Sequence, residues 1–463
     1  MNTKDENDSP EEHFTDTIKA ACGLADPNAV WGMTQAAPEL VHWLLKLGVK
    51  FNMSGYDDVD LRNFGGQKKK RTAFAQSDTG KQIMTAMIDA VRRKEAFGMV
   101  ERFSHHSFLT LRLCGNICCG CVIRDEYSQE TVELPGDAVI VATGGMHGLF
   151  GNTTGSLSNT GEVTAELFRL GVPLANGEMI QYHPTTVKCG GKRMLISEAA
   201  RGEGGRLFAM KDGKQWYFME EKYPELGNLM PRDITAREIW KVSHESEVFL
   251  DMTEISEEII SNKLSGLADD CMTYLHKDIR KEPVSVLPGI HYFMGGILVD
   301  EQHRTPIQNL YAAGECCAQY HGANRLGGNS LLGALYGGRV AAKSACEQAD
   351  VVDLSCATQI DFPPASQISE IKQLNKVMQE TMGVVRNENT LLNGIQTVQA
   401  LTGNLPLLGM AVLKSALARK ESRGAHWRED YPKSNDNDYL KTTVARFDGK
   451  QIQISFVPVP ERR

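Results

Sequence analysis

The sequence predicts an α/β protein of two or three domains, and three observations support this. First, "AVIVATGGMHG" places apolar residues directly before Thr143, Gly144 and Gly145, which is typical of a buried parallel strand that ends in a tight turn. Second, "NLYAAGE" again reads as a strand ending at glycine, and a helix with small residues on one face follows from Asn329. Third, 463 residues, 41% of them hydrophobic, can fill more than one core.

The composition argues against several classes of function. The formal net charge of −8 disfavours a general nucleic-acid or anionic-membrane surface, although a buried site can be locally basic and take an anionic substrate. The 11 cysteines show no regular disulfide spacing, and no signal peptide is recognised, so we expect a cytoplasmic protein with reduced thiols. No apolar run approaches the roughly 20 residues of a membrane helix, so another subunit would have to anchor the chain at a membrane.

The first hundred residues read as a polar start, two helices and a loop between them. "MNTKDENDSPEEHF" is polar and acidic, and we expect it to be either the middle of a larger unit or a loose arm. Core and amphipathic helices are predicted within residues 26–51 and 79–93. The basic run from Lys68 to Arg71 resembles a nuclear signal, but in an acidic chain a solvated loop is expected.

The segment "CGNICCGC", from Cys114 to Cys121, suggests a metal site, but its spacing does not match a tetrahedral zinc pattern. The flanking residues alternate like two strands joined by a turn at Gly115 and Asn116. Adjacent side chains of a strand point to opposite faces, so these thiols cannot all converge on one ion. We therefore expect a β-hairpin without a metal.

Strand-like and helical segments alternate beyond Gly148. A loop of small residues leads to a helix from Val163, and residues 177–287, with their own hydrophobic runs, are expected to form an inserted domain. Strands return at "GGILVD" and "NLYAAGE". The tail from Ser366 to Ala418 has helical periodicity, and strand-like pieces follow it.

Three segments in the middle of the chain carry residues suited to chemistry. In "QYHPTT", His183 precedes a proline and so lies on an extended or turn segment. "LISEAARGEGG" follows with Ser197, Glu198 and Arg201; the plain alternative is a structural histidine and an i,i+3 ion pair between Glu198 and Arg201. Arg232, in "MPRD", is at an expected helix start, where the helix dipole disfavours a cation, so its side chain is expected to point elsewhere, into a cleft.

Two later segments add a histidine and an arginine. His291, in "PGIHYFMGG", lies just before a Gly-Gly turn, where a ligand can approach the backbone closely. Arg325, in "HGANRLGGNSL", lies among glycine, alanine and asparagine, which suggests a bidentate clamp for a carboxylate. The helix that begins after "GGNS" offers free N–H groups to an electron-rich ligand atom.

Taken together and in this order, the motifs resemble the flavoprotein subunit family of succinate dehydrogenases and fumarate reductases. "QYHP", "SEAARGEGG", "PRD", "HYFMGG", "LYAAGE" and "HGANRLGGNSL" carry the resemblance, and "FGGQ" and "SRGAHWREDYP" extend it to about residues 63–432. The resemblance implies a FAD-binding domain of the glutathione-reductase type (residues 1–176 and 288–350, N-terminally incomplete). It also implies an inserted α+β capping domain (177–287) and a C-terminal helical domain (351–463).

The chemistry implied by the resemblance is hydride transfer between FAD and the C2–C3 unit of succinate or fumarate. The substrate-binding residues expected by motif position are His183, Ser197, His291, Arg325, Phe64 and Gly65. The first two would hold one carboxylate and the next two the other, because a dicarboxylate needs a clamp at each end.

The proton donor implied by the resemblance is Arg232, supplied by a relay through Glu198 and Arg201. From the residues alone, a histidine or a glutamate would have been the first choice, because an arginine is normally too weak an acid.

For FAD, the resemblance implies contacts from two turns and the start of one helix. The expected residues are Ala142, Thr143, Gly144, Glu162, Glu315, Ser330 and Leu331. The first three would border the adenosine half, Glu315 the ribityl chain, and the last two the isoalloxazine ring. The family usually has an aspartate in "TGDG" where this chain has Glu162 in "TGEV", which is a departure from the pattern.

A larger departure is at the start of the chain. The family's strand–GxGxxG–helix opening, its downstream acidic residue and the histidine that bonds FAD covalently in membrane complexes are not found. The chain is therefore expected to begin after them and, expressed alone, to bind FAD poorly.

Two alternatives stay open. One is L-aspartate oxidase, which shares much of the pattern, although "NFGGQ" and "QYHPTT" favour the dicarboxylate branch. The other is a truncated, flavin-free protein without activity. An iron–sulfur subunit is a candidate partner, and other subunits could hold the chain peripherally at the inner face of a membrane.

Overall fold

The computed structural model describes residues 2–4, 6–56, 58–64, 66–76, 78–156, 158–349, 362 and 367–463. Gly65, Ser366 and the predicted domain boundary between residues 350 and 351 lie outside these ranges. Helices and strands alternate along most of the chain, so the predicted α/β class is confirmed.

The N-terminal part begins with two helices that pack against each other. Its elements are α1 (Pro10–Ala20), α2 (Pro27–Leu47), the short strands β1 (Met53–Gly55), β2 (Asp58–Val59), β3 (Leu61–Arg62) and β4 (Thr72–Ala73), and α3 (Thr79–Ala96). Ser9 and Asp26 accept backbone hydrogen bonds at the starts of α1 and α2, and each helix has proline in its first turn. These residues are the ones that favour helix starts, so local sequence accounts for both helices.

One alternative and one expectation for this part were wrong for one reason. Of the two possibilities for the polar start, the loose arm is excluded, since Asp8, His13 and Asp16 are all buried. Arg71, predicted in a solvated loop, is also buried, and its guanidinium donates to Asp8 at 2.8 and 3.0 Å and to Asp16 at 2.8 Å. The charges pair with one another across more than 50 residues of sequence, which composition alone does not reveal. Lys68, in the same run, is exposed as expected.

The predicted cysteine hairpin is confirmed. Strands β5 (His106–Cys114) and β6 (Ile117–Asp125) are antiparallel and joined at Gly115, and β7 (Thr131–Pro135) completes the sheet. In the part of the chain that the structure describes, no three histidine, cysteine, aspartate or glutamate side chains gather to hold a metal.

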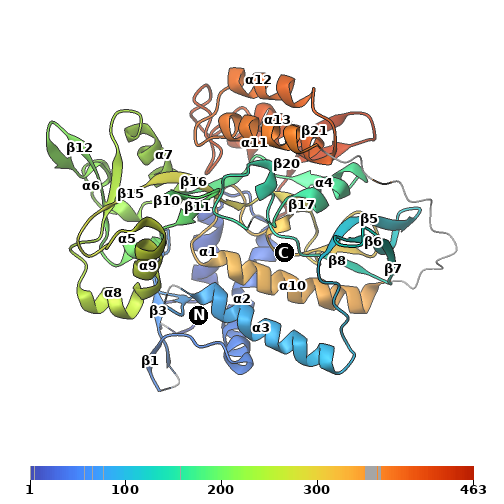
Figure 1. Ribbon diagram of the computed structural model, residues 1–463, viewed down its shortest axis with the longest axis horizontal. Helices are drawn as coiled ribbons and strands as arrows, with labels where there is room; N and C mark the ends of the chain where they lie inside the picture. Colours follow the sequence, from blue (N-terminus) through green and yellow to red (C-terminus); the bar gives the residue numbers. More distant parts are fainter. Residues whose placement is uncertain are drawn as a thin grey trace.

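The "ATGG" and "LYAAGE" segments lie side by side. They form the parallel strands β8 (Val139–Val141) and β18 (Leu310–Ala312), in which Val141 is opposite Ala312. Helix α10 (Asn329–Gln348) packs on both strands, as Figure 1 also shows. Because carboxyl ends of parallel strands meet at one edge, the turns after the two strands are neighbours.

A second sheet joins distant parts of the chain in the order β19–β17–β9–β20–β21. Its strands are β9 (Leu174–Ala175), β17 (Gly296–Leu298), β19 (Cys317–Ala318), β20 (Lys441–Phe447) and β21 (Ile452–Pro458). Helix α4 (Glu162–Arg169) packs near β17 and β20. The predicted strand-like pieces after the helical tail are therefore real, and they pair with strands from much earlier in the chain.

The middle of the chain has a hydrophobic core of its own. A three-stranded sheet, β10 (Ile180–Cys189), β11 (Lys192–Leu195) and β16 (Leu287–Phe293), leads into it. Beyond it lie β12 (Arg206–Lys211), β13 (Lys214–Trp216), β14 (Val248–Asp251) and β15 (Val284–Ser285), with α5 (Glu198–Gly202), α6 (Phe218–Lys222), α7 (Arg232–Val242), α8 (Glu257–Lys263) and α9 (Ser265–Asp270). Buried residues between Ile196 and Val286 make up this core, and the part stands to the left in Figure 1.

The C-terminal helices α11 (Ile368–Thr381), α12 (Glu388–Val398) and α13 (Asn404–Ala418) share a core with earlier segments, and the short α14 (Asp436–Tyr439) follows. Met146, Phe150 and Phe168 pack in the same cluster as Leu408 and Val412. In Figure 1 these helices lie at the opposite side of the molecule from α2, α3 and α10.

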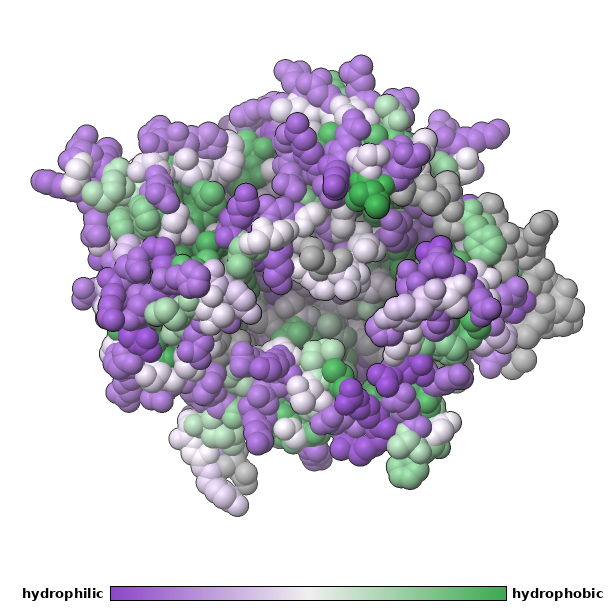
Figure 2. All heavy atoms as spheres, in the orientation of Figure 1, coloured by the Kyte–Doolittle hydropathy of each residue, from purple (hydrophilic) through white to green (hydrophobic). Residues whose placement is uncertain are grey.

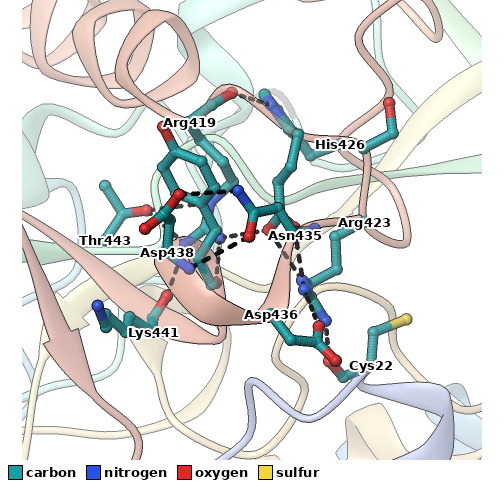
Figure 3. A network of polar contacts seen from close by, with 12 residues as sticks. Cys22, Arg419, Arg423, His426, Asn435, Asp436, Asp438, Lys441 and Thr443 are labelled. Atoms are coloured by element: carbon teal, nitrogen blue, oxygen red, sulfur yellow. Dashed lines mark hydrogen bonds and ion pairs between the residues drawn. The ribbon is translucent and has the colours of Figure 1, made fainter. Parts of the chain in front are cut away.

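The motif "SRGAHWREDYP" forms a buried polar network with the end of α13 (Figure 3). Arg419 donates to Glu178 at 2.7 Å, to Glu421 at 2.8 Å and to both Thr443 and backbone carbonyls. Arg423 donates to Glu421 and to the Cys22 carbonyl at the end of α1. The network therefore ties the C-terminal region to the N-terminal helices.

The last residues of the chain contact the starts of α1 and α2. Arg462 donates to Glu11 at 2.8 and 3.0 Å, and the Arg463 N–H donates to Asn28 at 2.9 Å. Figure 2 shows that the face in view is largely hydrophilic. Within the described ranges, no helix is long and apolar enough to cross a membrane.

Candidate active site

A cavity of about 330 Å³ collects most of the residues predicted to touch substrate, and its volume is within the range of small-molecule sites. Its wall includes Phe64, His183, Ser197, Glu198, Arg232, His291, Arg325, Ser330 and Leu331. These residues come from six separate segments of the chain. Arg201 does not line the cavity but donates to Glu198, which does. Gly65 lies outside the described residues.

Strands β10 and β16 place the two histidines next to each other. The strands are antiparallel, and the His183 and His291 rings lie 5.2 Å apart in an edge-to-face arrangement. His291 Nδ1 contacts the Thr154 hydroxyl at 2.8 Å. The Nε2 atom of His183 is buried and has no hydrogen-bond partner among the described residues. A buried polar atom without a partner costs about 1–3 kcal/mol, which points to a ligand at this position.

Both histidines are uncharged near neutral pH. Burial lowers the pKa of His183 well below its ordinary value, and the nearby Arg232 lowers it further. Burial also lowers the pKa of His291, with His183 and Arg325 adding to the effect. The two rings can therefore act as hydrogen-bonding groups, and the positive charge of the site comes from arginine.

Arg325 is buried and only partly bonded. Its Nε donates to Gln181 at 3.2 Å, and its guanidinium lies 4.5 Å over the Tyr292 ring. None of the described residues bonds to the two terminal nitrogens of Arg325, although the residue is only 4% exposed. Burial and Arg232 lower its pKa, so an added carboxylate would stabilise the charged form.

Arg232 begins α7 and points into the site, as its position against the helix dipole suggested. Its Nε and one terminal nitrogen donate to Glu198 at 3.0 and 2.6 Å, and the other terminal nitrogen donates to Gln181 at 3.1 Å. Glu198 also accepts from Arg201 at 3.2 Å. Burial alone would raise the pKa of Glu198, but the two guanidinium groups outweigh burial and hold it below its ordinary value.

Gln181 is the site residue that the sequence analysis missed. Its Oε1 accepts from both Arg232 and Arg325, and its Nε2 donates to Asn324. Side chains two residues apart on a strand share a face, so the position of His183 in "QYHP" already placed Gln181 beside it. The amide therefore holds the two arginines in one arrangement.

The turns expected to border FAD meet at the carboxyl ends of β8 and β18. A side chain added at Gly145 would come within 2.7 Å of Glu315, and one added at Gly144 within 2.6 Å of Asn159. Glu315 accepts the Phe293 N–H at 3.0 Å. Ala142 and Thr143 are exposed beside this turn, and Glu162 is the first residue of α4 just beyond Asn159. These residues lie around the glycine turn and do not line the cavity.

The start of α10 connects this turn region with the cavity. No side chain caps the helix, so the N–H groups of its first turn, at Ser330 and Leu331, are left for a ligand. The cavity wall beside them is apolar and includes Leu40, Leu44 and Phe74. A flat aromatic ring with hydrogen-bond acceptors along its edge, such as the flavin of FAD, fits this combination.

Two family models match the chain. The model described as FAD binding domain matches residues 1–331, and the model described as Fumarate reductase flavoprotein C-term matches residues 401–462.

Similar proteins include the succinate dehydrogenase flavoprotein subunit of Bacillus subtilis, at 36% identity over 100% of this chain and 90% of that protein. The L-aspartate oxidase of a Nostoc species is 31% identical over 95% of this chain and 84% of that protein. Among solved structures, a mutant of E. coli quinol fumarate reductase FrdA superimposes with a TM-score of 0.89 at 26% identity, covering 98% of this chain and 88% of that one.

Proposed function

Because the chain belongs to the flavoprotein family of succinate dehydrogenases and fumarate reductases, with FAD as its cofactor, we propose that it interconverts fumarate and succinate. The observation that carries the proposal is the pair of incompletely bonded groups in the cavity, the terminal nitrogens of Arg325 and the Nε2 atom of His183. Two separate donors facing one small cavity are what a ligand with two carboxylates requires.

In this proposal each carboxylate has its own clamp. Arg325 supplies charge and a bidentate fork to one carboxylate, with His291 beside it. His183 and Ser197 donate to the other. Because the histidines are neutral, they orient the substrate by hydrogen bonds without adding further charge. Fixing both ends aligns the C2–C3 bond before reaction, which reduces the entropy lost on reaching the transition state.

Arg232 is the proposed proton donor to the substrate carbon. Gln181 and Glu198 bond its guanidinium from three nitrogens, so its position is fixed. Glu198 is ionised while it lies between two charged arginines. Once Arg232 has given its proton to the substrate carbon, Glu198 would take a proton from Arg201 and pass it to Arg232, and Arg201 would regain a proton from water. The relay is buried, which keeps bulk water away from the reacting carbon. FAD, when bound along Ser330, Leu331 and the glycine turn, supplies or accepts the hydride.

The proposal is tested by adding FAD to the purified chain, removing free FAD by gel filtration, reducing the protein and then adding fumarate. A retained flavin absorbance band that fumarate restores after reduction would support it. A chain that leaves the column without flavin would contradict the activity for this chain alone and favour the flavin-free alternative. Strand β8 supports that alternative. Within the described ranges it pairs only with β18, and its Ile140 is 41% exposed, as expected for a strand that lacks a second neighbour.

L-aspartate oxidase is separated from this proposal by the substrate. The chain resembles both kinds of enzyme, with the higher identity to the succinate dehydrogenase subunit. Turnover of L-aspartate with no response to fumarate would exclude the dicarboxylate assignment.

The relatives' description as flavoprotein subunits supports a complex with further subunits. We expect an iron–sulfur subunit as the electron partner, in an assembly peripheral to the inner face of the membrane. Co-purification of an iron–sulfur protein with the tagged chain from its native host, and loss of dye-independent turnover without it, would test this.

A further inference from the structure

A second and larger cavity adjoins the proposed active site. It has a volume of about 780 Å³. It shares Arg62, Phe64, Gln67, Phe74, Arg232 and Arg325 with the active-site cavity of about 330 Å³, which is called the inner cavity below. These shared residues form the partition between the two spaces. A four-carbon dicarboxylate is far smaller than the second cavity, so this space suits passage better than tight binding.

The partition contains a segment held by one side chain. Gln67 accepts the Phe64 N–H at 3.1 Å and donates to the Gly327 carbonyl at 2.9 Å and to Thr72 at 3.0 Å. These bonds hold Phe64 and Gln67 against the turn that precedes α10. Arg232 and Arg325 face both cavities across this partition.

The second cavity is basic although the chain is acidic. Its wall includes seven cationic side chains, namely Lys19, Arg62, Lys68, Lys70, Arg232, Lys263 and Arg325, against three carboxylates, namely Asp16, Glu203 and Asp233. This excess is opposite in sign to the net charge of −8. Part of the basic run that resembled a nuclear signal therefore lies on the wall of this cavity.

Ion pairs cancel part of this charge. Glu203 pairs with Lys263 at 3.1 Å, Asp16 pairs with the buried Arg71 and lies 3.8 Å from Lys68, and Glu198 pairs with Arg232. Burial raises the pKa of Asp233, which accepts a hydrogen bond from Asn324. By contrast, Lys19 and Lys70 have no ion-pair partner anywhere in the described part of the chain.

We propose that the second cavity is an antechamber that concentrates dianionic substrates before they cross to the inner cavity, with Lys19 and Lys70 as its free charges. The inference rests on the proposed dicarboxylate function and adds the route of substrate approach. A cleft lined by one sign of charge raises the local concentration of counter-ions. The anion would then pass from Lys19 and Lys70 to Arg232 and Arg325, which line both cavities.

The test compares two double variants with the same change in net charge. The first is Lys19→Gln with Lys70→Gln. The control is Lys50→Gln with Lys69→Gln, since Lys69 lies between two wall residues in sequence but lines neither cavity, and Lys50 is exposed elsewhere. Affinities for succinate and for butyrate, its four-carbon monoanionic counterpart, are measured by titration calorimetry with excess FAD at low and high ionic strength.

We expect the first variant to bind succinate about 3–10-fold more weakly than the unsubstituted chain at low ionic strength. This is less than the roughly 10–10³-fold effect of a whole charged cleft, because only two of its charges are removed. Because the energy in a given potential is proportional to charge, butyrate should be weakened only by about the square root of that factor. The control should change either affinity little, and the difference should disappear at about 0.5 M salt, where screening acts over a few ångströms.

Equal effects of the two variants, equal effects on succinate and butyrate, or a difference that survives high salt would each overturn the antechamber while leaving the proposed function intact. If the unsubstituted chain binds no succinate, the proposed function itself fails, and the antechamber fails with it.

Discussion

The active-site cavity and the C-terminal network both bury arginines, but they bond them differently. In the C-terminal network, every nitrogen of Arg419 donates to a carboxylate, a hydroxyl or a backbone carbonyl. In the cavity, Arg325 makes one hydrogen bond, from Nε to Gln181. Both side chains are nearly inaccessible to solvent.

Under the proposed function, this difference distinguishes a structural arginine, Arg419, from a substrate-binding arginine, Arg325. A buried charge is costly unless it is paired and bonded, so a saturated guanidinium such as Arg419 stabilises the fold that surrounds it. Arg325 carries the cost of burial without the full set of bonds, and a ligand can supply the rest. Burial alone would have ranked the two residues equally, whereas the count of bonded nitrogens distinguishes them.

The largest expected effect concerns Arg232, which Gln181 and Glu198 hold in place and which is the proposed proton donor. Arg232→Gln should lower kcat for fumarate reduction by about 10²–10⁴-fold, the usual range for a general acid, with flavin absorbance intact. Reduction of fumarate by a reduced dye measures it. Arg237→Gln is the matched control, because Arg237 lies on the same helix and stacks on Trp427 outside the cavity. If the Arg232 variant keeps more than a few per cent of kcat, the acid lies elsewhere, with Glu198 next to be tested.

The comparison predicts that removing Arg419 destabilises the fold. Arg419→Met leaves Glu178 buried without its ion-pair partner and removes one of the two arginines that pair with Glu421, so the free energy of unfolding should fall by about 3–5 kcal/mol. Denaturant titration measures the change. Lys420→Met, at the exposed neighbouring position, should stay within about 0.5 kcal/mol of the unsubstituted protein. A similarly small change at Arg419 would mean that the saturated network contributes little.

Arg325 should show the opposite behaviour. Arg325→Lys should weaken dicarboxylate binding by about 1.5–3 kcal/mol through loss of charge-assisted hydrogen bonds. The free energy of unfolding should change far less than for Arg419→Met, because few protein bonds are lost. Titration calorimetry and denaturant titration on the same samples measure both quantities. Unchanged KM and kcat would end the assignment of Arg325 as a substrate clamp.

The smallest expected effect is the absence of a pH response. The pKa values of His183 and His291 are both lowered well below 6.5, so neither ring in the free enzyme changes charge as the pH rises from about 6 to 8. The profile of kcat/KM, which reports groups of the free enzyme, should therefore show no inflection from these residues near pH 6.5. An inflection there that disappears in His183→Gln would show that this histidine must be protonated to bind substrate.

Local patterns predicted the elements, and motif order predicted most of the residues that line the cavity. The period-two alternation around Cys114 predicted the hairpin, and the proline before Arg232 marked the start of α7. Long-range pairing was beyond such reasoning. Asp8 and Arg71 are 63 residues apart and Glu178 and Arg419 are 241 apart, so the burial of these charges depends on tertiary contacts that no local window contains. Gln181 was missed for a different reason. Its amide is neutral, and the prediction of the site was based on the ionisable residues near it.

The contact between the C-terminal residues and helix α1 has a practical consequence for engineering the protein. Glu11 and Arg462 are bonded to each other at the surface, with their side chains 54% and 36% exposed. A tag fused after Arg463 would therefore emerge beside the start of α1, and it should be attached through a flexible linker that leaves this ion pair intact. An insertion can instead be placed at an exposed turn such as Gly190 and Gly191, where an added side chain would meet no atom.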